Sequence, residues 1–264
     1  MTHYDEKDLY SGLGALHWYA ITDTDPRHDE AFFGQAIRRG GGPALELGCG
    51  AGRLLLRYLA EGLEVSGCDI SADMLAVCRQ RAGEAGLEAR LYEQAMQELD
   101  LPHRFRTIYI PCGSFVCVMD REQALQTLIR CRRHLDDGGQ LVFNVFLPDH
   151  DYGRPVSPDG YPGAWTFKAE KSLPGDRRLV VRSRDTGLDP VEQTWHEERR
   201  YELYQGDTLR QTEVRAGQGR WYFRNELLWM LRLAGFRDAT VTGDYTGEPF
   251  GPQHTAVMMV TATA

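Results

Sequence analysis

The sequence predicts an α/β protein with a Rossmann-like, doubly wound sheet. Between residues 43 and 148, short apolar runs alternate with segments of helical periodicity, which is typical of βαβ units around a parallel sheet. The first apolar run leads directly into a glycine-rich turn at residues 48–52. After residue 148 the pattern changes to strand-like alternation between turn residues. This change predicts an antiparallel β insertion after the fifth strand.

The central zone, 43–148, divides into strands and helices by the period of its apolar residues. Ser71 is an expected N-cap, with Asp73 in the first turn of its helix. The run at 136–139, Asp-Asp-Gly-Gly, is expected to end the long helix before it. Strands are expected at 44–47, 63–68, 89–93, 107–110 and 140–146, and helices at 51–61, 71–85 and 121–135.

The flanking zones complete the expected organisation. Residues 1–42 predict one or two amphipathic helices that form an N-terminal helical lid and close on a Gly-Pro break. The insertion, 149–221, is expected to cover the substrate or form a dimer contact, while 43–148 and 222–264 together form the Rossmann-like domain. Strands are expected at 165–171, 179–184, 193–204, 208–214, 239–242 and 256–262, and a helix at 225–234; turns are expected at 174–175, 186–187 and 205–207.

Composition narrows the class of protein. The 264 residues carry a formal net charge of −8, which disfavours a protein that holds nucleic acid by bulk charge. We expect a cytoplasmic protein, because there is neither a membrane-spanning apolar run nor a signal-peptide pattern. Cys131 and His134 lack a second ligand pair, so no metal site is expected.

The turn after the first strand carries the chemistry. Its glycines follow the spacing G-x-G-x-G, whereas a dinucleotide site has G-x-G-x-x-G and a P-loop needs Gly-Lys-Ser/Thr. Glu46, just before the turn, would repel a pyrophosphate and suits a ligand with a cationic, amino-acid-like end. Asp69 ends the second strand 19 positions after Gly50, where a carboxylate can accept hydrogen bonds from ribose hydroxyls.

The stretch ALELGCGAGRLLLRYLAEGLEVSGCDISADMLAVCRQRA, residues 44–82, resembles the cofactor-binding half of class I S-adenosylmethionine (SAM)-dependent methyltransferases. It is similar to their small-molecule branch, which includes glycine N-methyltransferase and the amino-sugar N,N-dimethyltransferases. The resemblance implies SAM as cofactor and S-adenosylhomocysteine (SAH) as product. It also implies a seven-stranded sheet of order 3-2-1-4-5-7-6 with an antiparallel last strand.

The resemblance further assigns site residues. Glu46 and the glycines would surround the methionine part of SAM, and Asp69 would bind the ribose. Ile70 and Met74 would pack on the adenine. Ala95 stands where relatives often have an aspartate on the adenine amino group, so the backbone at Ala95 and Met96 could suffice, or Gln94 or Glu98 could substitute for it. Arg53 could pair with the SAM carboxylate or lie on a solvated helix face. The expected cofactor set is Glu46, Gly48, Cys49, Gly50, Gly52, Arg53, Asp69, Ile70, Met74, Ala95, Met96 and Pro111.

The acceptor is expected to be a small soluble metabolite, methylated at N or O by in-line displacement. An RNA or protein methyltransferase, and a non-catalytic SAM- or SAH-binding protein, are the alternatives. The sequence fixes no catalytic base; the candidates are His150, Tyr10, Tyr222 and His196. Expected pocket residues are Tyr4, Tyr10, Trp18, Tyr19, Phe115, His150, Tyr152, Trp195 and Tyr222. A homodimer through the insertion is also considered.

Overall fold

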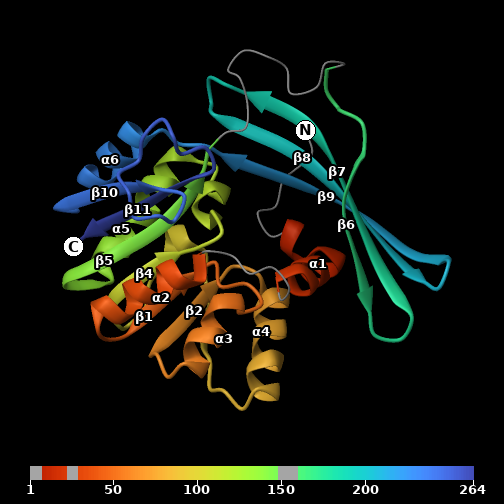
Figure 1. The fold of residues 1–264 in the computed structure, drawn as a ribbon, viewed down its shortest axis with the longest axis horizontal. Coiled ribbons are helices and arrows are strands. Elements are labelled where there is room, and N and C mark those ends of the chain that lie inside the picture. The colour runs from red at the N-terminus through yellow and green to blue at the C-terminus, as the bar shows by residue number, and fades with distance from the viewer. Residues whose placement is uncertain (1–7, 23–28, 148–159) are drawn as a thin grey trace. The chain divides into compact units, whose positions relative to one another are not determined.

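The computed structural model describes residues 8–22, 29–147 and 160–264. The chain divides into two compact units (Figure 1). The first unit joins residues 1–25 to 149–220, and the second joins 26–148 to 221–264. In the described part of the chain, no helix is long and apolar enough to cross a membrane.

The second unit contains a seven-stranded sheet. Counted along this unit, its strand order is the predicted 3-2-1-4-5-7-6, and the last strand in the chain, β11, runs antiparallel to β5 and β10. The order across the sheet is β10 (Asp238–Gly243), β11 (Val257–Thr263), β5 (Leu135–Phe146), β4 (Phe105–Ile110), β1 (Ala44–Leu47), β2 (Val65–Asp69) and β3 (Arg90–Glu93).

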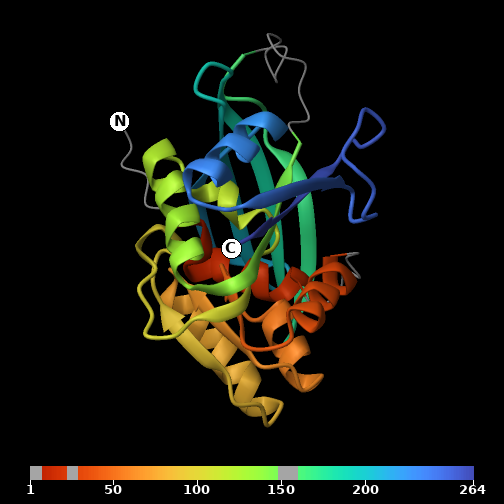
Figure 2. The same cartoon turned by 90° about the vertical axis from the view of Figure 1, so that its left-hand side faces the viewer.

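Helices cover both faces of this sheet (Figures 1 and 2). One core cluster joins alternate strand residues to helices α2, α3 and α4, and the other joins the intervening residues to α5 and α6. In β5, for example, Phe143 belongs to the second cluster and Val142 to the first. The helices are α2 (Asp29–Gly40), α3 (Arg53–Ala60), α4 (Ala72–Glu84), α5 (Arg121–Arg133) and α6 (Arg224–Leu233), with short 3-10 helices η2 (Met96–Glu98) and η3 (Ser114–Cys117).

Most element boundaries follow local chemistry. The predicted cap of α4 is confirmed, because the Ser71 hydroxyl accepts a hydrogen bond from the Met74 N–H at 3.2 Å. Helix α3 begins at Arg53 rather than at residue 51, since Gly52 has a left-handed φ of 83°. The expected end of α5 at 136–139 is wrong. Leu135 already pairs with Phe105 in the sheet, and residues 136–139 form an irregularity between that pair and Thr107–Gln140.

The first unit is an antiparallel sheet of four strands in the order β6, β7, β8, β9. The predicted turn at 186–187 is wrong, because β7 continues through a register shift and Gly187 pairs with His196. Leu13 of α1 packs on Leu179, Val181 and Tyr201 of the sheet. The elements are η1 (Asp8–Tyr10), α1 (Gly12–Thr22), β6 (Thr166–Leu173), β7 (Arg177–Asp189), β8 (Thr194–Gln205) and β9 (Thr208–Arg220).

The two N-terminal helices fall into different compact units. Helix α1 belongs with the four-stranded sheet, whereas α2 belongs with the seven-stranded sheet. Their packing explains the division. Leu13 of α1 joins the small core of the first unit, and Phe33 and Ile37 of α2 join a core cluster of the second unit.

Candidate functional site

The glycine turn lies where β1 ends, at the carboxyl edge of the seven-stranded sheet. Gly48, Gly50 and Gly52 all have left-handed φ values, 72°, 53° and 83°. There is also little space for a side chain at these positions. A Cβ on Gly48 would lie 2.8 Å from the Ser114 hydroxyl oxygen, and one on Gly50 would lie 2.9 Å from the end of Met74. Glycine is therefore required on two grounds.

Asp69 ties this turn to the end of β2. Its Oδ2 accepts a hydrogen bond from the Gly50 N–H at 2.7 Å, and its Oδ1 accepts one from the Ser71 N–H at 2.8 Å. Burial raises the pKa of Asp69, and these backbone donors act against that rise. Each carboxylate oxygen has two acceptor positions, and the backbone donors at Gly50, Ile70 and Ser71 leave acceptor capacity for a ligand.

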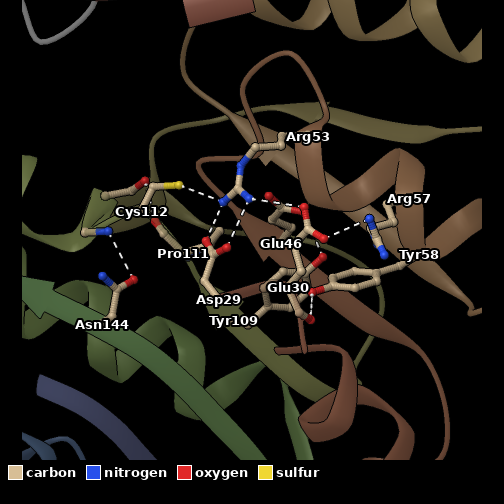
Figure 3. Close-up of polar contacts among 12 residues, drawn as sticks. Asp29, Glu30, Glu46, Arg53, Arg57, Tyr58, Tyr109, Pro111, Cys112 and Asn144 are labelled. Carbon is tan, nitrogen blue, oxygen red and sulfur yellow. Dashed lines mark hydrogen bonds and ion pairs between the residues drawn. The ribbon is translucent and has the colours of Figure 1, made fainter. Parts of the chain in front are cut away.

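Glu46 of β1 is a buried acid, only 2% exposed. The Tyr109 hydroxyl of β4 donates a hydrogen bond to its Oε2 at 2.7 Å (Figure 3). Burial raises the pKa of Glu46 to about 8, although the bond from Tyr109 and the charge of Arg53 oppose the rise. The carboxyl group is consequently protonated at neutral pH, until a cation is brought to it.

Arg53 is bound inside the protein rather than solvated. Both of its terminal nitrogens donate to the Asp29 carboxylate of α2, with Nη1 to Oδ1 at 3.1 Å, and Nη2 also contacts Cys112 Sγ at 3.1 Å (Figure 3). The side chains of Arg53 and Asp29 are 9% and 2% exposed. The solvated-face alternative for Arg53 is therefore wrong, and pairing with a ligand carboxylate stays a prediction.

The turn after β4 has an unusual backbone. Cys112 and Gly113 are both left-handed, with φ of 57° and 70°, and strained non-glycine residues of this kind cluster at functional sites. The Gly113 N–H donates to Asn144 Oδ1 of β5 at 3.1 Å. Sequence reasoning missed Asn144, although a polar residue within the apolar run LVFNVF was a usable signal.

The loop after β3 contains Ala95, at the position where relatives often have the aspartate that binds the adenine amino group. Gln94 is engaged with its own loop, since its amide donates to the Asp100 carbonyl at 3.2 Å and accepts from the Asp100 N–H at 2.9 Å. Glu98 is exposed. Met96 approaches the Gly48 turn, because a Cβ on Gly48 would lie 4.0 Å from its terminal carbon. The contact of an adenine ring with Ile70, Met74 and the backbone at Ala95 stays a prediction.

The expected pocket residues separate into three groups. Tyr4, His150 and Tyr152 lie outside the described residues, as does the side chain of Tyr19. Tyr10 and Trp18 pack together in the first unit, with ring centroids 5.6 Å apart, and Trp195 and His196 lie on β8. Phe115 and Tyr222 are buried in the second unit with ring centroids 5.2 Å apart. In this structure neither of those two rings lines an accessible surface.

Known methyltransferases are similar in sequence to the part of the chain that carries the candidate cofactor site. Residues 44–139 match the family model described as a methyltransferase domain. Over these residues the chain is similar to a methyltransferase domain. A putative methyltransferase of a Geobacillus species is 32% identical over 108 residues, which are 41% of this chain and 44% of the relative. The demethylmenaquinone methyltransferase of Thermus thermophilus is 38% identical over 107 residues, or 39% of this chain and 47% of the relative. These matches span less than half of each relative.

Solved methyltransferase structures resemble the chain over nearly its whole length. The CcbJ methyltransferase of Streptomyces caelestis superposes with a TM-score of 0.73 at 20% identity, covering 99% of this chain and 100% of that one. A sugar N-methyltransferase of a Streptoalloteichus species gives 0.72 at 18% identity, covering 100% of this chain and 96% of that one. At such identities the likeness establishes the fold, including the added antiparallel sheet.

Proposed function

We propose that this methyltransferase transfers a methyl group from SAM to nitrogen or oxygen of a small soluble molecule. The observation that carries the proposal is the glycine turn fixed by Asp69 beside the buried carboxyl group of Glu46. Such a site offers a hydrogen-bond acceptor for ribose hydroxyls and a partner for an ammonium group. It lies within the residues that match a methyltransferase domain. Solved relatives of the same fold include enzymes named for sugar and glycopeptide N-methylation.

Each part of the site would contact a different part of SAM. Bound SAM supplies an already activated methyl group, so the protein chiefly binds, orients and excludes water. Glu46 would face the methionine ammonium group, and Asp69 the ribose hydroxyls. The glycines allow the backbone to approach the methionine part closely. The turn at Cys112 and Gly113 would border the sulfonium and the acceptor.

Several finer points belong to the same proposal. A net charge of −8 supports a small-molecule acceptor over a nucleic acid. Six free cysteines support a reducing compartment such as the cytoplasm. The four-stranded sheet would serve as a substrate cover or a homodimer contact.

Calorimetry with SAM and SAH, followed by a metabolite panel in which SAH formation is measured, tests the function. We expect both ligands to bind and at least one small acceptor to yield SAH. Binding without turnover on any acceptor would favour the non-catalytic alternative. Absence of binding to either ligand would refute both functions.

A further inference from the structure

Strand β5 ends in an exposed aromatic ring at the edge of the sheet that holds the candidate site. Phe146, its last residue, is 46% exposed, whereas the five residues before it are buried. Because β5 runs parallel to β4, its carboxyl end lies at the same edge as the turn at Cys112 and Gly113. A large apolar side chain is thus presented to solvent where ligands of open α/β sheets bind.

The Phe146 ring is held in place by its neighbours. A Cβ on Gly113 would lie 2.5 Å and 2.7 Å from two of its ring carbons, so the ring rests directly against the glycine. Gly113 is itself fixed by the hydrogen bond to Asn144. Asn144 and Phe146 are two positions apart and therefore face the same side of β5. Strand β5 therefore contacts the turn twice: Asn144 hydrogen-bonds Gly113, and the Phe146 ring packs against it.

The chemistry beside the ring favours an apolar contact. At this turn Arg53 contacts Cys112, and its charge is paired with the Asp29 carboxylate. The Asn144 amide is fully buried, and its oxygen faces Gly113 because a backbone N–H can only donate. The turn and the end of β5 therefore offer a ligand the exposed part of the apolar Phe146 side chain.

We propose that Phe146 stacks on a ring of the methyl acceptor and selects acceptors with a flat apolar face, either an aromatic ring or the C–H face of a sugar. This inference rests on the proposed function. Covering the exposed ring removes apolar surface from water, and ring stacking adds a directional contact. An acceptor without a ring, such as an aliphatic chain or a small amino acid, buries less apolar surface and makes no stacking contact.

The test uses the full-length protein saturated with SAH, and two ring probes, catechol and D-glucosamine, titrated by ligand-observed NMR. Phe146→Ala removes the ring, and Phe146→Leu keeps an apolar side chain without it. Trp229→Ala is the matched control, since Trp229 is a 62% exposed aromatic on α6, which packs on the other face of the sheet. SAH affinity is measured for every variant.

We expect at least one probe to bind the wild-type protein and to bind Phe146→Ala about 3- to 10-fold more weakly. Phe146→Leu should fall between them, and Trp229→Ala should match the wild type. Preference for catechol would indicate an aromatic acceptor, and preference for D-glucosamine a sugar. The SAH affinity of the Phe146 variants should stay unchanged.

The inference is wrong if neither probe binds the SAH-loaded wild type, or if Phe146→Ala and Phe146→Leu bind the probes as the wild type does. Either result leaves the methyltransferase proposal standing. Failure of the wild type to bind SAH at all would instead refute the proposed function. Should Phe146→Ala lose SAH binding through misfolding, Phe146→Leu alone decides.

Discussion

At the scale of single residues, the proton on Glu46 has measurable consequences. Its pKa is about 8 in the folded protein against an ordinary 4.5, so the folded state holds a proton that the unfolded chain releases within that range. Stability should therefore fall as pH rises from about 4.5 to about 8. Urea denaturation across this range checks the slope. Glu46→Gln should flatten it, and an unchanged slope in that variant would assign the effect to another group.

Ligand binding should displace the same proton. An ammonium group beside Glu46 favours the carboxylate, so we expect SAM binding at pH 7 to release about 0.9 proton. Calorimetry in two buffers of different ionisation enthalpy measures this release directly. The Glu46→Gln variant is the control and should release almost none. Equal release from both proteins would show that Glu46 is not the group that faces the cation.

Asp69 should matter more for affinity than any nearby surface acid. Asp69→Ala removes the expected ribose acceptor and the support of the Gly50 N–H, so SAH binding should weaken by about 10- to 100-fold. Asp238→Ala, at an exposed position on β10, serves as the control. Calorimetric titration compares the two. An Asp69→Ala protein that binds SAH like the wild type would overturn the ribose assignment.

At the scale of elements, the Arg53–Asp29 pair joins α3 to α2 within the protein. Asp29→Asn removes the hydrogen-bonded countercharge of a guanidinium 9% exposed and leaves it only the Glu30 carboxylate at 3.9 Å, so we expect a loss of about 3 kcal/mol of unfolding free energy. Arg57→Gln breaks a more exposed ion pair, between Glu30 and an Arg57 side chain that is 54% exposed. This change should lower the unfolding free energy by less than about 1 kcal/mol. Urea denaturation measures both. Equal losses would show that burial does not distinguish the pairs.

At the scale of the whole molecule, the two units have separate cores. SAH at about 100 times its dissociation constant should stabilise the unit that binds it by about 2.7 kcal/mol. Hydrogen exchange should therefore slow at Leu45 and Ile108 of the seven-stranded sheet more than at Val181 and Tyr201 of the four-stranded sheet. These four residues are all buried in strands. Equal slowing in both sheets would contradict a site confined to the second unit.

Helix and strand boundaries show how far local information reaches. The sheet order followed from the resemblance to class I methyltransferases, whereas the cap at Ser71 could be predicted because capping depends on neighbours in sequence. The turn expected at 186–187 failed for a nonlocal reason. Pairing with β8 keeps Gly187 in the ladder despite its turn-like composition.

The sequence by itself determined the glycine turn and its acid, since left-handed backbone and strand-end spacing are properties of one short segment. Only the tertiary structure decided the partners of the charged and polar groups. Arg53 binds Asp29 from 24 residues away, Glu46 is bonded to Tyr109 from 63 residues away, and Gly113 to Asn144 from 31 residues away. Such contacts depend on which elements pack together, and burial then sets both the charge state of Glu46 and the exposure of Phe146.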